Sequence, residues 1–332
     1  MQLVLNTEGL VMRVRDGVFC VSTGDEFRKF SPDQLNSIAI TEPCMLSSAA
    51  VMLAAETGIP IYLFDRIGDA QACLRSPYFE SISTLRRRQV YFSDDVEGAQ
   101  WVLEQFVHKT EHQLQLLKWL KNRRAAYAKN IEETMRQMQE ALEQLPPVKG
   151  DIQAPGRAWN ALLMGWEGNQ GRRYWSRLGA LMPEGWQFKG RSRRPAKDRF
   201  NAVLNYSYGM LYTKVEQAIF AAGLDPHLGI LHVDQYDRPT LAYDLIEPFR
   251  PWADRLIVEY VFSDLAEEDH FERFKDGFYL SRNGKRVFIP LFNEWLRTKV
   301  RWQGRQQSRE QHIFTAAALL AKRIRKISKR PE

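Results

Sequence analysis

The chain has 332 residues, of which 44% are hydrophobic, and this is enough for the core of one large domain or two ordinary ones. Apolar stretches such as Ala50–Ala55 are far too short to cross a bilayer, and the N-terminus lacks the long apolar segment of a signal peptide. We therefore expect a cytoplasmic protein with no membrane partner. The formal net charge of +7 favours anionic partners such as nucleic acid. The cysteines Cys20, Cys44 and Cys73 are too few and too scattered for a disulfide framework or a thiolate zinc site.

Residues 1–75 carry the pattern of short strands. Apolar and polar residues alternate along Val11–Val21, and Asp16-Gly17 interrupts the alternation as a two-residue hairpin turn does. Two β-branched runs and one alanine-rich helical segment also lie in this region: Ser37–Thr41, Ile59–Phe64 and Ser47–Glu56. This part of the chain is expected to be a small, mostly β domain.

From about residue 84 the pattern changes to a helical period. Leu103, Phe106 and Leu117 belong to one apolar stripe of a long helix predicted over Trp101–Arg124. Five more segments have the same period: Ile131–Leu142, Asp198–Ala222, Pro251–Phe262, Val287–Trp302 and Glu310–Ile327. The sequence thus predicts an α+β fold, with a β-rich N-terminal domain over residues 1–80, a linker over 81–90 and a larger all-α C-terminal domain over 91–332.

The first segment that suggests chemistry is Gly165-Trp-Glu167-Gly168. A carboxylate flanked by glycines allows a metal or a bulky ligand to approach the backbone closely. The alternative is the start of a helix, with the charge of Glu167 in its first turn favoured by the helix dipole.

The second segment, Gly223-Leu-Asp-Pro-His-Leu-Gly-Ile-Leu-His232, ends a short apolar run with a histidine. An imidazole in this position is either a metal ligand or a core histidine whose hydrogen bonds are satisfied within the protein.

The third segment is Tyr243-Asp244-Leu-Ile-Glu247-Pro-Phe-Arg250. Asp244 and Glu247 are three residues apart, which places both carboxylates on one face if the segment is helical. Pro248 and Pro251 fit only a helix that begins near residue 248. Two acids at the entrance of that helix are equally typical of caps.

Taken together, the three segments supply one imidazole and two or three carboxylates. Such a set is typical of Mg²⁺ or Mn²⁺ sites and leaves coordination positions open for phosphate oxygens and water. Phosphoryl transfer requires this arrangement, because it depends mainly on positioning and on neutralising charge.

The order and spacing of these motifs resemble CRISPR-associated protein one, the family of CRISPR adaptation integrases and endonucleases. The resemblance rests on the Glu167-Gly168 segment, then G-L-D-P-x-x-G-x-L-H, then Y-D-L-x-E-x-F-R-P, and on a β-rich domain preceding a helical one. It therefore extends over nearly the whole chain.

By that resemblance, Glu167, His232 and Glu247 fall on the family's metal ligands, and Asp244 falls on the neighbouring acid. All four are our predicted catalytic residues. The last ligand is aspartate in some members of the family and glutamate here. The resemblance further implies a homodimer, with the N-terminal domain as the expected dimerisation region, and assembly with CRISPR-associated protein two on double-stranded DNA.

A competing motif is His108-Lys-Thr-Glu111-His112, which matches the inverted zinc-protease signature H-x-x-E-H. On a helix, the two histidines share a face that is able to hold zinc. However, this stretch lies beside the apolar stripe among residues typical of a solvated flank.

Residues 189–199 form a dense basic loop between Glu167 and His232, with aromatic neighbours in Trp186 and Phe188. We expect phosphate contacts there, because lysine and arginine neutralise the nucleic-acid backbone. The predicted DNA-binding residues are Arg173, Lys189, Arg191, Arg193, Arg194, Lys197, Tyr243 and Arg250.

The sequence thus predicts an integrase in which the 3′-hydroxyl of a spacer strand attacks a phosphate of the CRISPR repeat at a Mg²⁺ or Mn²⁺ site. This chemistry needs no protein nucleophile, in agreement with the absence of an activated serine or cysteine motif. The rival hypothesis is a basic, non-catalytic nucleic-acid-binding protein whose acids only cap helices.

Overall fold

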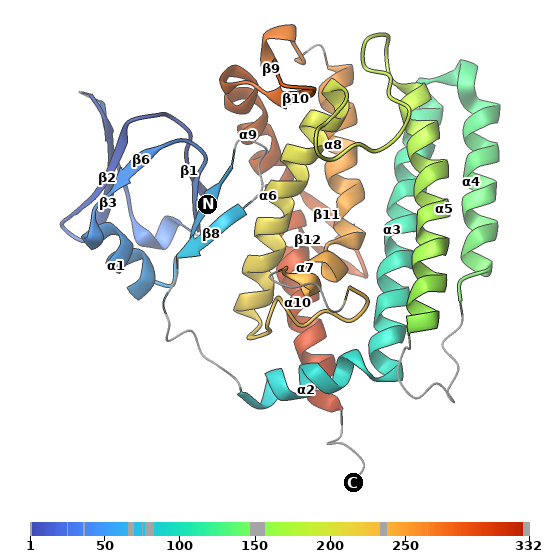
Figure 1. Ribbon diagram of the computed structural model, residues 1–332, viewed down its shortest axis with the longest axis horizontal. Helices are drawn as coiled ribbons and strands as arrows, with labels where there is room; N and C mark the ends of the chain where they lie inside the picture. The colour runs from blue at the N-terminus through green and yellow to red at the C-terminus, as the bar shows by residue number, and fades with distance from the viewer. Residues whose placement is uncertain are drawn as a thin grey trace.

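The chain folds into a strand-rich N-terminal region and a mostly helical C-terminal region that lie side by side (Figure 1). The computed structural model describes residues 2–24, 26–35, 37–65, 70–74, 76, 83–146, 157–232, 238–263 and 265–327. Each region has its own hydrophobic core, built around Phe19 and Ile38 in the first and around Phe200 and Phe249 in the second. The predicted α+β fold class is confirmed.

Two four-stranded sheets form the N-terminal region. The first has the order β1 (Gln2–Leu5), β5 (Ser37–Ile40), β7 (Ile61–Phe64) and β8 (Ala70–Leu74). The second has the order β4 (Glu26–Phe30), β3 (Val18–Thr23), β2 (Leu10–Arg15) and β6 (Cys44–Leu46). The short helices are η1 (Pro32–Gln34) and α1 (Ser48–Glu56). Asp16 and Gly17 both have positive φ angles, 51° and 73°, so the predicted β2–β3 hairpin turn is confirmed.

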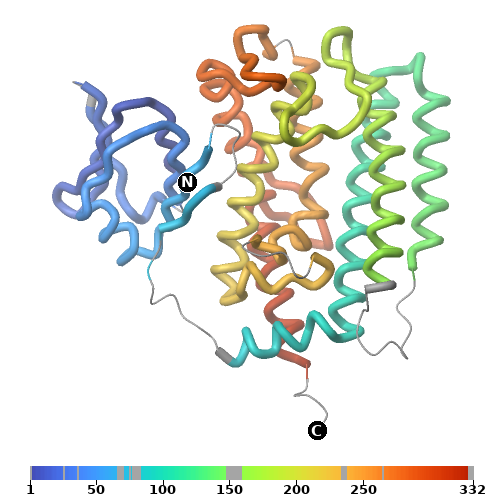
Figure 2. Tube along the Cα trace, viewed as in Figure 1, coloured from blue at the N-terminus to red at the C-terminus, as the bar shows by residue number. Residues whose placement is uncertain are grey.

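The C-terminal region is built from nine α-helices, counted over its described residues: α2 (Ser83–Ser93), α3 (Val96–Arg123), α4 (Ala128–Glu143), α5 (Arg157–Leu181), α6 (Arg199–Ala221), α7 (Thr240–Leu245), α8 (Arg250–Phe262), α9 (Arg282–Arg297) and α10 (Arg309–Lys326). Three 3₁₀ turns accompany them: η2 (Ala125–Tyr127), η3 (Glu247–Phe249) and η4 (Glu268–His270). The buried helix α6 packs against α8 and α10, and α3 packs against α4, α8 and η3. Figure 2 shows α10 rising through the middle of this region, with its C-terminal end beside α2.

Three sequence predictions about this region need correction. It also contains two hairpins, β9 (Phe271–Phe274) with β10 (Gly277–Leu280) and β11 (Lys299–Trp302) with β12 (Arg305–Ser308), so it is not all-helical. The helix predicted over Val287–Trp302 ends at Arg297, because Thr298 is already extended, with ψ 128°, and the chain continues into β11. Most of the predicted linker, from residue 83, is helix α2.

In the part of the chain that the structure describes, none of the helices combines the length and the apolar character that crossing a membrane requires.

Candidate metal centre

Glu167, Glu247 and His232 come from three elements of the helical region. Glu167 lies in the middle of α5, which begins ten residues earlier at Arg157, so the alternative of a first-turn position is wrong. Glu247 is the first residue of η3, between α7 and α8. His232 lies in the segment that connects α6 to α7.

A lysine joins the two glutamates. The Lys109 ammonium nitrogen, from α3, lies 2.6 Å from Oε1 of Glu167 and 2.8 Å from Oε2 of Glu247. The Glu247 side chain is only 5% exposed, whereas that of Glu167 is 36% exposed. The two carboxylates therefore face each other across one cation, with Glu167 on the solvent side.

Asp244 organises the loop that carries His232. Its Oδ2 accepts hydrogen bonds from the backbone N–H groups of Ile230 and Leu231, at 2.7 and 3.1 Å. Its Oδ1 lies 2.6 Å from Nδ1 of His232. A buried carboxylate thus fixes both the backbone and the ring, and the alternative of a simple helix cap does not describe Asp244.

His232 is oriented with its other nitrogen available. Because the Asp244 carboxylate accepts a hydrogen bond from the Nδ1–H group, the neutral imidazole carries its proton on Nδ1 and keeps a lone pair on Nε2. Among the described residues, none hydrogen-bonds to Nε2. Burial alone would lower the pKa of His232, but the hydrogen bond and charge of Asp244 outweigh burial and raise it.

Arg250 completes the charge balance around Glu247. Its Nη2 lies 3.1 Å from Oε1 of Glu247 and donates to the Tyr212 hydroxyl at 2.6 Å. Burial would raise the pKa of Glu247, but Arg250 and Lys109 outweigh burial and lower it. Glu247 is therefore held as a buried carboxylate between two cations.

A second polar layer lies below the centre. The buried carboxylate of Asp254, on α8, accepts hydrogen bonds from the Tyr174 hydroxyl of α5 at 2.9 Å and the Tyr208 hydroxyl of α6 at 2.8 Å. Tyr174 and Asp254 each follow a predicted ligand by seven residues, or two helical turns. These hydrogen bonds connect α5, which carries Glu167, to α6 and to α8, which follows Glu247.

The donor set fits a hard divalent cation. Oε2 of Glu247 is buried and has no hydrogen bond, only the ion pair with Lys109. Two carboxylates and one imidazole nitrogen with a free lone pair are ligands that Mg²⁺ and Mn²⁺ accept. Buried polar atoms usually have partners, and the only partner of this oxygen among the described residues is the Lys109 ammonium at 2.8 Å, so the position suits a cation.

The H-x-x-E-H stretch contributes to this centre in a different way from the zinc-protease hypothesis. His112 is buried, its Nδ1 lies 2.7 Å from the carbonyl oxygen of Pro248, and burial lowers its pKa to about 4. His108 hydrogen-bonds to Glu111 and to Gln303. The stretch therefore anchors η3 to α3, and within the described residues its side chains belong to no group of three metal-ligating atoms within 4.8 Å of one another.

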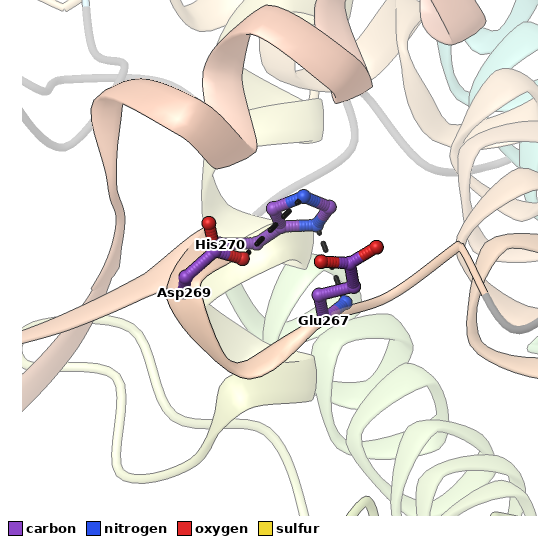
Figure 3. Close-up of side chains that lie close together, drawn as sticks. All are labelled: Glu267, Asp269 and His270. Atoms are coloured by element: carbon purple, nitrogen blue, oxygen red, sulfur yellow. Dashed lines mark hydrogen bonds and ion pairs between the residues drawn. The ribbon is translucent and has the colours of Figure 1, made fainter.

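One other group in the described residues has metal-ligating atoms close together. Glu267, Asp269 and His270 place one ligand atom each within 4.8 Å of one another (Figure 3). However, Nδ1 of the buried His270 accepts from the backbone N–H of Glu267 at 3.3 Å and lies 2.7 Å from the Tyr260 hydroxyl. This imidazole already has a structural role, and the two acids are exposed.

The predicted DNA-binding residues fall into two groups. Five are exposed on α5 and on the loop before α6: Arg173, Lys189, Arg193, Arg194 and Lys197. Arg191, Tyr243 and Arg250 are partly buried. Arg191 donates to Asn201 at 2.9 Å and to the Ser192 carbonyl at 2.7 Å, and Tyr243 lies edge-on to His232 with ring centroids 5.9 Å apart. The residues of the second group therefore make contacts within the protein, and Tyr243 and Arg250 contact the candidate ligands His232 and Glu247.

Sequence reasoning missed Lys109, Tyr208 and Asp254. Lys109 lies inside the H-x-x-E-H stretch, and Asp254 is an acidic residue among the buried apolar residues of α8. A charge inside a helix with a buried face was the available signal, because such a residue needs a partner.

The fold and the centre define an α+β protein in which a small β-rich domain precedes a helical domain with a carboxylate–imidazole site. The family described as CRISPR associated protein Cas1 matches residues 3–294. The chain belongs to this family.

Curated relatives are similar over most of the chain. A CRISPR-associated endonuclease Cas1 of Thermus thermophilus is 30% identical, and the match covers 89% of this chain and 87% of the relative. A CRISPR-associated endonuclease Cas1 of Archaeoglobus fulgidus is 29% identical, with 92% and 91% covered.

Solved structures share the fold. A casposase bound to integration product superposes with a TM-score of 0.80 at 24% identity, over 99% of this chain and 92% of the other. A CAS1 protein from Thermotoga maritima has a TM-score of 0.78 at 21% identity, with both chains fully covered. At these identities the likeness supports the shared architecture.

Proposed function

We propose that this protein is a divalent-metal-dependent DNA integrase and endonuclease of CRISPR adaptation, which inserts short duplex DNA into the repeat array. Membership of the Cas1 family supports the coarser part of this proposal, a nuclease or integrase of CRISPR adaptation. The observation that carries the rest is the pair of carboxylates, Glu167 and Glu247, facing each other across one cation beside an imidazole with a free nitrogen.

In this proposal Glu167, His232 and Glu247 hold Mg²⁺ or Mn²⁺, which when bound would neutralise charge on the scissile phosphate. Asp244 accepts a hydrogen bond from Nδ1 of His232 and so keeps the lone pair of the imidazole on Nε2, where it would be able to bind a metal ion. Arg250 keeps Glu247 ionised and in place. The graded exposure of the two glutamates leaves the Glu167 side open to DNA.

The reaction is a transesterification. The 3′-hydroxyl oxygen of the incoming strand forms a new bond to the phosphorus of the repeat backbone, while the bond from that phosphorus to the leaving 3′-oxygen breaks. The attacking hydroxyl loses its proton and the leaving oxygen gains one. Water in place of the 3′-hydroxyl gives hydrolysis at the same site, which accounts for endonuclease activity.

The proposed partners follow from the charge distribution and the family. The exposed basic residues of α5 and of the loop before α6 would contact the phosphates of double-stranded DNA. A structure that matches this fold with a TM-score of 0.79 is titled a Cas6-RT-Cas1–Cas2 complex. We propose a homodimer that assembles with CRISPR-associated protein two.

The test uses the purified protein with CRISPR-associated protein two, labelled duplex DNA and a supercoiled repeat plasmid, with Mn²⁺, Mg²⁺ or chelator. The wild type should join strands only with metal. Glu167→Ala and Glu247→Ala should bind DNA but not join it. Glu140→Ala, which removes an exposed glutamate of α4, is the matched control and should join normally.

The rival function is a basic, non-catalytic DNA-binding protein. DNA binding with no metal-dependent joining or cleavage by any form would favour this rival. Equal joining by wild type and by both glutamate variants would remove the assignment of the site.

A further inference from the structure

Lys109 has an unusual place for a lysine. Its side chain is only 10% exposed, and its nitrogen makes ion pairs with two glutamates that are 80 positions apart in sequence, Glu167 and Glu247. Its ammonium also lies 5.5 Å from the ring centroid of Phe106, on the preceding turn of α3. A buried charge needs compensation, and here the two acids provide it.

The charge of Lys109 is maintained by those acids. Two carboxylates within 2.8 Å of its nitrogen favour the charged form of this buried lysine. The ammonium therefore stays a cation in the interior of the protein.

The spacing of the ligands points to competition with a metal ion. In the described residues, Glu267, Asp269 and His270 alone bring three metal-ligating atoms within 4.8 Å of one another. The atoms of Glu167, His232 and Glu247 are more widely spaced, and the Lys109 nitrogen lies between the two carboxylates. The ammonium thus occupies the space in which one ion would bind both carboxylate groups.

We propose that Lys109 is a resident counter-cation of the centre, which holds Glu167 and Glu247 facing each other before metal binds and must give up at least one of them when metal enters. The inference rests on the proposed function. Lys109 is in this role a positioning residue. It lowers metal affinity, because two cations compete for the same oxygens, and it stabilises the metal-free protein, because Oε2 of Glu247 has no other partner.

The test measures Mn²⁺ binding without DNA, by titration calorimetry or by the electron paramagnetic resonance signal of free Mn²⁺. Lys109→Met removes the charge and keeps an unbranched side chain that is one atom shorter. It should lower the Kd for Mn²⁺ by about tenfold or more, since a tenfold change corresponds to about 1.4 kcal/mol and two charges in contact exceed that.

Thermal unfolding provides a second readout. Metal-free Lys109→Met should unfold at a lower temperature than the wild type, and saturating Mn²⁺ should raise its Tm more than it raises that of the wild type. Lys109→Gln is the second variant, because its amide can donate to one carboxylate and support folding.

Lys214→Met is the matched control. Lys214 is another buried lysine of the helical region, paired at 2.7 Å with Glu310 on α10, away from the centre. Its loss should lower the Tm and leave the Kd for Mn²⁺ unchanged.

The outcomes separate the two proposals. Unchanged or weaker Mn²⁺ binding by both Lys109 variants, with a wild type that binds Mn²⁺, would overturn the role of Lys109 and leave the metal centre standing. If neither the wild type nor the variants bind Mn²⁺, the metal centre fails, and the inference fails with it.

Discussion

Two groups in the helical region each combine one histidine with two carboxylates, and they differ in how the atoms are used. Glu267, Asp269 and His270 are near neighbours in sequence and lie within 4.8 Å of one another (Figure 3). Glu167, His232 and Glu247 come from three elements far apart in the chain and are more widely spaced.

The difference indicates that a metal site is better recognised by ligand atoms without hydrogen-bond partners, which we call unused bonding capacity, than by the compactness of the group. In the compact group the histidine accepts a backbone N–H and contacts a tyrosine hydroxyl. In the dispersed group, Nε2 of His232 has no hydrogen-bond partner among the described residues, and Oε2 of Glu247 has only an ion pair. A metal ion in the second group would find a free imidazole nitrogen and compete only with the Lys109 ammonium for the carboxylate oxygens, whereas in the first group it would have to displace the hydrogen bonds of the imidazole nitrogen.

The largest expected effect comes from replacing His232 or His270 with alanine, one at a time. His232→Ala should reduce metal-dependent strand joining by about a thousandfold, since several kcal/mol of charge stabilisation depend on the bound cation. His270→Ala should join normally but lose about 1–3 kcal/mol of stability, because it leaves the Tyr260 hydroxyl and a backbone N–H without an acceptor. Joining rates and urea unfolding of both variants check this prediction, and the reverse pattern would exchange the roles of the two groups.

The next largest effect is a difference in Mn²⁺ affinity between variants of Asp244, which lies beside His232, and of Asp269, which lies beside His270. Asp244→Asn leaves one accepting oxygen, which the backbone N–H groups of Ile230 and Leu231 require, so the amide NH2 faces Nδ1 of His232. This donor favours the tautomer with the proton on Nε2, so Mn²⁺ affinity should fall by about 10–100-fold. Asp269→Asn changes a carboxylate 3.9 Å from His270 and should leave Mn²⁺ affinity unaltered. Calorimetric titration with Mn²⁺ measures both, and equal affinities would mean that Asp244 supports only the loop.

Much of the fold was predictable because its signals are local. Neighbouring residues specify the Asp16-Gly17 turn, the alanine-rich helix predicted over Ser47–Glu56 and the apolar stripe of α3. The two late hairpins were missed because their strands are only four residues long and their turns begin at Lys275 and Gln303, which are not typical of positive φ angles.

The candidate ligands were predictable for another reason, since family motifs mark them individually. Their supporting residues were not. Lys109 and Asp254 acquire their partners from helices distant in the chain, and no pattern around them specifies which helices those are. Partnerships of this kind depend on tertiary packing, which spacing along the sequence does not encode.

The buried cluster of Asp254, Tyr174 and Tyr208 should make the stability of the protein depend on pH. Burial raises the pKa of Asp254 from 3.8 to about 7, although Tyr208 and Tyr174 donate to it. Between these values the folded protein holds a proton that the unfolded chain has lost, so the free energy of unfolding should fall as pH rises through the window. We expect a loss on the order of 2 kcal/mol between pH 5 and pH 7 in the wild type. Asp254→Asn should lack this loss, which urea unfolding at several pH values measures. Parallel curves for the two proteins would mean that Asp254 is ionised throughout.

The smallest effect is expected from the compact group itself. Glu267→Gln removes one exposed charge and keeps the backbone N–H that donates to His270. It should therefore leave the Tm unchanged and alter the Kd for Mn²⁺ by less than about twofold. The measurement is the same Mn²⁺ titration, with Glu167→Gln as the matched variant of the dispersed group. A loss of Mn²⁺ binding in Glu267→Gln that equals the loss in Glu167→Gln would show that compactness, and not unused bonding capacity, selects the metal site in this protein.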